Sequence, residues 1–515
     1  AGQTANGMSW QLNWLGEQSQ VVFGAALDNT SVDFRQGQQL GFVNDTREVV
    51  LAPERYDDLF LVPLIQEIQR NNLVGGSDAG SIYVKAITTN PPFWTHDSTL
   101  HLNAGLRYNR TRVTQQLTAD RPIPLYQFDE SLFRRLAPRC GAERGDAFAR
   151  YYCTQGNYLY ESLNPSAGVS WLPKETLNLY LNWSRGSRVP STIELGCARD
   201  REGERLAGGG RNTGRTPGCS VPTALTFDPF LPQVISYTTE LGLRGSSEDG
   251  RIAWNAGVYQ TNLSNDILFV SLGSRNRGVF DTFGKTRRRG LEFGMDGQFG
   301  RHRLTASYSR VDATFESMAE VVNPSNSTST REVGKVSTFI IQPGDRIPGI
   351  PRDSMRLSWR YDATDRVNLG LSMIAQSWSF VRGNENNDHA PVGTDSNGEP
   401  TLGTLDPTIT VEPGRRYVGS GRIPGFAIFN VVASYQATAQ LSFSLRVDNV
   451  LDRRYVTAGG LALNPFSPSV WGVRDAGGFN YNSNDWTHST FVGPGAPRAL
   501  WLSLNYVFDT GGQRP

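Results

Sequence analysis

Four cysteines carry the most reactive side chains of the chain, and they fall in two close pairs, Cys140 with Cys153 and Cys197 with Cys219. Each pair lies in a stretch rich in glycine, proline and arginine between periodic segments. This placement predicts two disulfides that staple loops, and disulfides indicate an oxidising compartment. Neither pair has the short ligand spacing of a structural zinc site, so the cysteines do not predict bound zinc.

The five histidines are scattered over expected turns, strands and loops. They form no His-Glu-x-x-His motif, and the chain has neither a phosphate-binding P-loop nor a Gly-x-Ser-x-Gly nucleophile motif. The sequence therefore predicts that the protein is not an enzyme and holds no metal or other cofactor of its own.

Arginine and aromatic side chains in the expected loops are the best candidates for contact with a ligand. Guanidinium groups bind anions bidentately, and aromatic rings stack on planar groups and on cations. The alternative is that these residues pack the loops or form a girdle at the membrane boundary. The candidates are Trp378, Arg382, Tyr417, Trp471, Tyr481 and Trp486.

The elements that must position these residues follow from a period of two. Every second residue from Leu100 to Tyr108 is apolar, while polar residues and glycine fill the positions between them. This pattern predicts a β-strand with one apolar face. The alternation recurs over residues 177–184, 291–296, 367–373, 441–448 and 500–508.

Strand length and loop length indicate the kind of β-protein. Segments of about ten residues with aromatic ends are typical of transmembrane strands. Short and long connections alternate, as they do in outer-membrane barrels with short periplasmic turns. The expected short connections are residues 16–19, 90–97, 173–176, 245–250, 300–302, 362–366 and 437–440. The expected long ones are residues 38–79, 114–162, 191–233, 314–353, 380–425 and 457–497, with a modest one at 271–278.

Composition agrees with a barrel. The 515 residues include 54 Gly and 28 Pro, and only 38% are hydrophobic, which is low for several packed cores. Fifty basic and 49 acidic residues give a net charge of +1, which removes the usual reason to expect nucleic-acid binding. No run of 18 apolar residues occurs, so no membrane-spanning helix is expected. The N-terminus lacks signal-peptide features, which predicts that the chain begins after processing or inside a longer protein.

Several phrases from about residue 80 onward resemble the TonB-dependent outer-membrane receptors, in the order in which that family has them. They are NPSAGVSWLPKETLNLYLNWSRGSRVPSTIELG (164–196), YTTELGLRG (237–245), FGKTRRRGLEFGMDG (283–297), GDRIPGIPRDSMRLSW (344–359), RGNENN (382–387), LRVDNVLDRRYVT (445–457) and GPGAPRALWLSLNYVF (493–508). Each falls on the strand or turn that the periodicity predicts.

The resemblance implies an all-β fold, a transmembrane antiparallel β-barrel of the 22-stranded family type, in the outer membrane of a Gram-negative bacterium. It implies import of a scarce nutrient such as a ferric siderophore or a similar metal chelate. The implied partners are TonB with its inner-membrane energising complex, acting through a plug domain, together with outer-membrane lipid, lipopolysaccharide and the small ligand.

The chain departs from the family pattern in what it lacks. Roughly fifteen strands can be counted where the family has about 22, and no segment has the pattern of a plug. The sequence therefore predicts a C-terminal barrel portion over residues 1–508 and a short periplasmic tail over 509–515, with plug and early strands absent. Two alternatives stay open: a passive porin, and a plugless barrel that acts as a surface-binding or scaffold protein.

Two of the phrases also predict local structure. In VDNVLDRRY, Asn449 and Asp452 are expected to bond nearby backbone where a strand leaves the membrane. In KTRRRGLE, Arg287, Arg289 and Glu292 are expected near the polar side of a strand, in cross-strand charge pairs. Apolar residues between 59 and 68 predict a short amphipathic helix in the first long loop.

Overall fold

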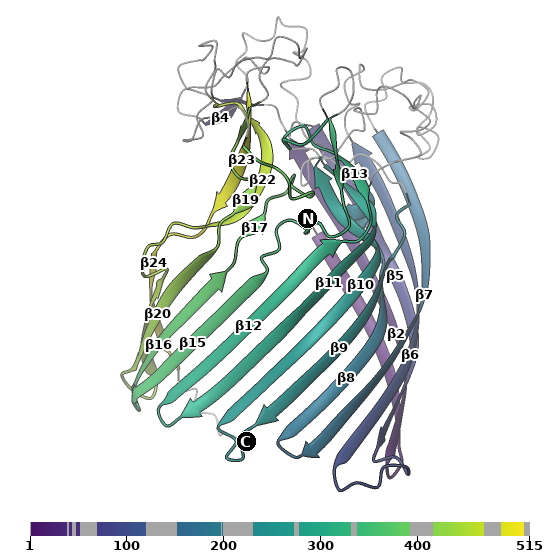
Figure 1. Cartoon of the computed structure of the whole chain (residues 1–515), viewed down its shortest axis with the longest axis vertical. Coiled ribbons are helices and arrows are strands. Elements are labelled where there is room, and N and C mark those ends of the chain that lie inside the picture. The colour runs from purple at the N-terminus through teal and green to yellow at the C-terminus, as the bar shows by residue number, and fades with distance from the viewer. Residues whose placement is uncertain are drawn as a thin grey trace, which may run out of the picture.

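The alternating segments pair into one large antiparallel sheet, which curves into a barrel-like wall (Figure 1). The computed structural model describes residues 2–38, 41–43, 48–51, 69–119, 152–196, 198, 230–271, 278–330, 337–391, 416–467 and 486–508. Within them the sheet has 15 strands, and each strand is bonded to the next wall strand along the chain. The predicted fold class and strand number are confirmed.

The wall strands follow one another in space as they do in sequence. They are β1 (Gly2–Leu15), β2 (Ser19–Gln38), β5 (Gln69–Thr89), β6 (Thr99–Ala119), β7 (Tyr152–Lys174), β8 (Leu177–Arg188), β9 (Val234–Ser246), β10 (Ile252–Ser271), β11 (Gly278–Phe299), β12 (His302–Phe315), β15 (Asp353–Thr364), β16 (Val367–Gln376), β20 (Phe426–Gln436), β21 (Leu441–Asp448) and β24 (Ala499–Tyr506).

The register places the apolar residues of neighbouring strands side by side. Val258 lies between Leu241 and Leu291, and these side chains are 51%, 53% and 38% exposed. The opposite face of the same strands carries polar residues, such as Glu240 and Glu292. A sheet that exposes a continuous apolar face needs an apolar solvent on that side, which a lipid bilayer provides.

The seven predicted short connections are confirmed as the turns at one end of the wall. The predicted long connections were too long near the first strands. Residues 69–79 belong to β5, and residues 114–119 and 152–162 belong to β6 and β7. In these extensions many positions are polar or glycine, and the apolar residues that occur, such as Leu73 next to Val74, are not spaced by two, so the period of two is lost from the sequence although the strand continues.

The wall is high on one side and low on the other. Strand β7 has 23 residues and β11 has 22, whereas β21 and β24 have 8 each. Because a tilted strand crosses a bilayer in about 9–11 residues, the long strands must extend well beyond the membrane at the loop end. Figure 1 shows this difference between the β7 side and the β24 side.

Small sheets and one short helix occupy the described parts of the long connections. The strands are β3 (Gly41–Val43), β4 (Val49–Leu51), β13 (Ala319–Val322), β14 (Thr338–Ile341), β17 (Ser379–Phe380), β18 (Tyr417–Val418), β19 (Arg422–Ile423), β22 (Val456–Asn464) and β23 (Thr487–Pro494), and the helix is α3 (Thr192–Gly196). In the described residues no helix is long and apolar enough to cross a membrane. The predicted helix between residues 59 and 68 lies outside the described residues.

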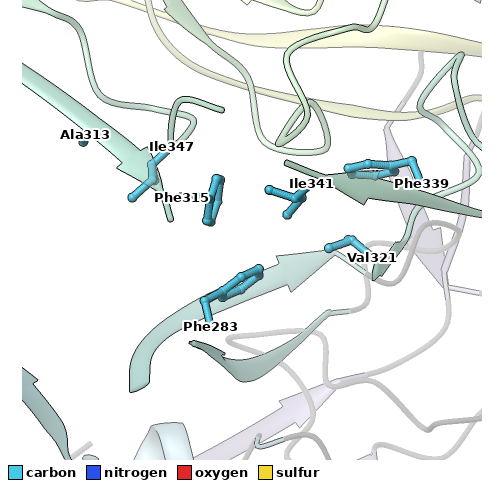
Figure 2. Packing of buried hydrophobic residues seen from close by; sticks show 7 residues of the cluster. All are labelled: Phe283, Ala313, Phe315, Val321, Phe339, Ile341 and Ile347. Atoms are coloured by element: carbon cyan, nitrogen blue, oxygen red, sulfur yellow. The ribbon is translucent and has the colours of Figure 1, made fainter. Parts of the chain in front are cut away.

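Buried apolar clusters lie at the loop end, where the connections pack on the wall. Figure 2 shows one of them: Phe315 of β12 lies against Ile341 of β14, and Phe283 of β11 packs nearby. These contacts attach the small β13–β14 sheet to the wall. The sites of burial therefore lie at the end of the wall, while its middle presents one face to lipid.

The sheet has two free edges. Strand β1 pairs only with β2, and β24 pairs only with β21, so the described strands do not close into a ring. Backbone groups at an open edge have no partners in hydrocarbon, where each unpaired group costs several kcal/mol.

Candidate functional site

The three long connections nearest the C-terminus meet at the loop end and form one buried polar cluster. We call it the apical knot and define it as residues 323–329, 383–390, 416–421 and 487–490. At its centre is the RGNENN phrase, which runs from Arg382 to Asn387. In this phrase Asn384, Glu385 and Asn386 are all buried.

Asparagine side chains hold the knot together. Asn326, which is fully buried, donates from Nδ2 to the carbonyl oxygen of Gly383 and to Oδ1 of Asn386, both at 2.9 Å. Asn384 donates to the carbonyl oxygen of Gly421 at 3.2 Å. Because these bonds join segments that are 37 and 57 residues apart in sequence, the knot fixes the relative positions of separate connections.

Two aromatic side chains extend the knot to β23. The ring of Tyr417 has no exposed surface and stacks on His488 with 4.9 Å between centroids. Its hydroxyl donates to the carbonyl oxygen of Pro324 at 3.3 Å. Nδ1 of His488 is hydrogen-bonded to Oγ of Ser325 at 2.9 Å. Tyr417 therefore packs the knot and presents no surface to a ligand in this conformation.

Burial shifts the pKa of two titratable groups in the knot. His389 is 7% exposed, and its Nδ1 accepts a hydrogen bond from the backbone N–H of Ser327 at 3.1 Å. Burial lowers the pKa of His389 from 6.5 to about 4, so the ring is neutral at neutral pH. Burial raises the pKa of Glu385, whose Oε1 accepts from the backbone N–H of Gly383 at 2.8 Å. Protonation of His389 would turn Nδ1 from a hydrogen-bond acceptor into a donor that faces the backbone N–H of Ser327.

The other predicted ligand residues are dispersed. Trp378 lies between two guanidinium groups, with Cζ of Arg346 4.8 Å and Cζ of Arg422 4.6 Å from its ring centroid. Arg382 is exposed, and its backbone bonds to residues of β22. Trp486 is half-buried beside β23. Trp471 and Tyr481 lie outside the described residues, and the other four predicted residues do not line one common pocket in the described part of the chain.

The cysteine prediction is not tested. Cys140, Cys197 and Cys219 lie outside the described residues. The backbone of Cys153 is described, in β7 opposite Thr118 of β6. The two predicted disulfides stay a prediction.

The PSTIEL part of the first phrase forms the start of α3. Oγ of Ser191 accepts from the N–H of Glu194, and the Glu194 carboxylate accepts from the N–H of Ser191. This reciprocal pair is a capping box, which begins a helix at low cost. The helix buries Leu195 inside the wall against Val113 and Tyr160.

Two local predictions from the phrases have clear outcomes. Asn449 bonds the backbone as expected: its Nδ2 donates to the carbonyl oxygen of Arg453 at 2.9 Å where β21 ends. Arg287 and Arg289 form the expected charge pairs. The placement of Arg287 and Arg289 on the polar side with Glu292 was wrong, because both arginines share the apolar face with Leu291 and Glu292 points to the other side.

The polar face of the wall contains a pocket of about 380 Å³ that is lined by residues of β2, β5, β6, β7 and β8. Arg107 lines it and donates to Ser81 at 2.9 Å and to Asn109 at 2.8 Å. The carboxylate of Asp28 lines the same pocket, and among the described residues no carboxylate pairs with Arg107, so the pocket offers one group of each charge to a polar solute. The sequence reasoning missed this residue, because an arginine on the polar face of a strand has no signal that separates it from other wall residues.

Comparison with known families decides what this wall is. The profile described as "TonB dependent receptor-like, beta-barrel" matches residues 2–450 of the chain. The chain belongs to this family. TonB-dependent receptors are transport receptors of the Gram-negative outer membrane, not enzymes.

Solved structures of TonB-dependent receptors share the fold. The siderophore receptor PiuA of Acinetobacter baumannii superposes with a TM-score of 0.54 at 13% identity, over 98% of this chain and 56% of that protein. The ferric yersiniabactin uptake receptor FyuA of Yersinia pestis gives 0.56 at 13% identity, over 98% and 55%. The chain thus spans little more than half of their length. No curated protein matches the chain.

Proposed function

We propose that the protein imports a scarce nutrient, a ferric siderophore or a similar metal chelate, across the outer membrane. The observation that carries this proposal is the match to the TonB-dependent receptor barrel over residues 2–450. A wall that is apolar outside and polar inside suits a barrel that lets a polar solute pass. Iron arrives already chelated, so the protein needs no iron ligands of its own.

The driving force comes from a partner. The outer membrane holds neither ATP nor an ion gradient, so the work must be transmitted mechanically by TonB and its inner-membrane complex. The chain spans 56% of PiuA and 55% of FyuA, and the edges of β1 and β24 are open. Both facts support a protein in which further strands close this barrel and a plug fills it.

The loop end is the side that meets the ligand. It carries Arg382 with an exposed side chain, and the apical knot holds the loop that bears it. Guanidinium groups bind the carboxylate, phenolate or hydroxamate oxygens of a chelate. The continuous apolar belt supports a location in the outer membrane of a Gram-negative bacterium, with lipid and lipopolysaccharide as the partners around the wall.

Uptake of a radiolabelled ferric chelate tests the proposal. Cells that express the protein should accumulate iron from at least one chelate, and deletion of TonB should abolish that uptake. Uptake that persists without TonB, together with ion conductance in planar bilayers, would identify a porin. No uptake from any chelate class, with the protein present at the surface, would identify a binding or scaffold protein.

A further inference from the structure

A group of arginines lies on the outer, lipid-facing side of the wall, just beyond the apolar belt at the loop end. Leu291 of β11 is the last apolar residue there, and Arg289 follows it on the same face. Arg310 of β12 lies directly across from Leu291. We call the outer arginine surface the side chains of Arg289, Arg310, Arg346, Arg352 and Arg422. Of these, Arg346 is only 9% exposed, so it adds positive charge to the surface and the other four arginines provide the contact area.

Two aspartates neutralise only part of this charge. Asp312 pairs with Arg289 at 3.2 Å and with Arg352 at 3.0 Å. Asp353 pairs with Arg310 at 3.3 Å. Five arginines and two aspartates leave three positive charges in excess. The three paired arginines stay between 42% and 55% exposed, so a second anion can reach them.

The two other arginines stack on aromatic rings and have no carboxylate partner among the described residues. Arg346 and Arg422 flank Trp378, and both also lie over Phe380, at 5.5 and 5.2 Å from its ring centroid. The backbone of Arg346 forms an isolated antiparallel β-bridge with that of Thr314 of β12. Bridge partners point their side chains to the same side of a sheet, and Thr314 is two residues from Asp312, so Arg346 lies on the same side of the wall as Asp312. Burial, and then the nearby charge of Arg352, lower the pKa of Arg346, as expected for a cation without enough counter-charge.

The surface continues into a groove that is charged at one end and apolar at the other. The groove has a volume of about 630 Å³. Leu241, Val258 and Leu291 line it on the membrane side, and Arg289, Arg310 and Arg352 line it on the loop side. This arrangement fits a molecule with a phosphate next to an acyl chain, because guanidinium forks bind phosphate bidentately and the leucines cover hydrocarbon.

We propose that the outer arginine surface binds the phosphates of lipopolysaccharide, with the first part of an acyl chain in the groove. The assignment rests on the proposed outer-membrane location, which puts the loop end in the leaflet where this lipid is found. Among anionic lipids, the one with two phosphates on a rigid disaccharide best matches several arginines spread over three neighbouring wall strands, β11, β12 and the start of β15. Free phosphate would leave the apolar half of the groove uncovered.

The test measures retention of bis-phosphorylated lipid A by the full chain, with native mass spectrometry from detergent. The variant is Arg289→Gln with Arg422→Gln, which leaves Asp312 paired with Arg352 and so creates no unpaired buried carboxylate. Since a basic residue beside an anionic lipid surface is worth about 1 kcal/mol, or about five-fold in affinity, the double variant should bind lipid A about 25-fold more weakly. A variant with lysine at both positions keeps the positive charge and should therefore lose less affinity for lipid A than the glutamine variant.

The control is Arg303→Gln with Arg446→Gln. These two side chains are 58% and 60% exposed and pair with Asp296 and Asp448, but they face the inside of the wall. The control should retain lipid A like the wild type. Equal loss in both variants, or loss in neither, would overturn the proposal. Retention of phosphatidylglycerol as strong as that of lipid A, or displacement of lipid A by millimolar inorganic phosphate, would overturn the choice of lipid.

Two further measurements keep the outcome clear. If the glutamine variant does not fold, the wild type is tested in 0.1 and 1 M salt, and retention that does not fall with salt would contradict the proposal. Chelate uptake is measured in parallel in cells that carry the lysine variant. If the glutamine variant loses lipid A but wild-type cells take up no chelate, the proposed import function is wrong and the proposed lipid site still stands. Failure of one proposal can therefore be distinguished from failure of the other.

Discussion

Acidification should open the apical knot through His389. The pKa of this ring is about 4 in the closed knot and 6.5 when the ring is exposed. Between these two values the open state binds more protons, so the contribution of His389 to closure is complete above pH 6.5 and is lost as the pH falls towards 4. The difference of about 2.5 pKa units corresponds to about 3 kcal/mol in the free energy of opening.

The assay is hydrogen exchange of the backbone amides over residues 383–390, with intrinsic rates corrected for pH. The perturbation is His389→Gln, whose side-chain oxygen can still accept from the N–H of Ser327 but does not titrate. All other titrating groups are the same in both proteins, so they cancel in the difference. The wild type should lose up to about 3 kcal/mol of protection relative to the variant between pH 6.5 and 4.

Parallel pH profiles of the two proteins would refute this reasoning. A second variant checks the sign. Because burial raises the pKa of Glu385, that carboxyl is protonated in the closed knot above its ordinary pKa, and its effect on closure weakens as the pH rises. Glu385→Gln should therefore make closure less sensitive to rising pH, the opposite direction to the effect of His389→Gln.

Three further changes test the wall and the knot. Leu371→Arg places a charge on the lipid face of β16 and should reduce the free energy of unfolding in liposomes by about 2–4 kcal/mol, whereas Ser372→Arg on the inner face should change it little. A Cβ on Gly242 would come 2.3 Å from Cζ of Tyr180, so Gly242→Ala should cost about 1–3 kcal/mol in urea unfolding, and Tyr180→Ala in the same chain should recover part of that loss. Asn326→Ala leaves two buried acceptors unbonded and should lower the free energy of knot opening by at least about 1 kcal/mol in hydrogen exchange, without changing the unfolding of the wall.

The wall could be predicted from the sequence because each of its strands meets two different solvents. Leu241, Val258 and Leu291 alternate with polar neighbours since one face is apolar and the other is wet. Turns were predictable for a related reason, since a short polar interruption between two alternating segments has one simple geometry. The strand extensions above the apolar belt could not be predicted in this way, because residues 69–79 form part of β5 but show no alternation of apolar and polar residues.

The loop end could not be predicted in the same way. Tyr417 and Trp378 have the residue types that contact ligands, yet Tyr417 is buried on His488 and the ring of Trp378 is stacked between two arginines. Whether an aromatic residue packs or binds depends on contacts between segments that are far apart in sequence. Nothing in the order of residues shows that Asn326 will meet Asn386, which lies 60 positions later. The RGNENN phrase indicated the place but not its role in joining loops.

The unequal height of the wall has a consequence for what can touch the protein from outside the cell. On the side of β5, β6 and β7 an antibody or a phage tail meets long strands whose outward residues include charged pairs such as Arg110 and Glu161. On the side of β21 and β24 the wall strands end lower, and the hairpin of β22 and β23 rises above them at the loop end (Figure 1). An epitope inserted on the side of β5, β6 and β7 should therefore be carried by continuous wall strands, while one on the side of β21 and β24 would be carried by a separate hairpin.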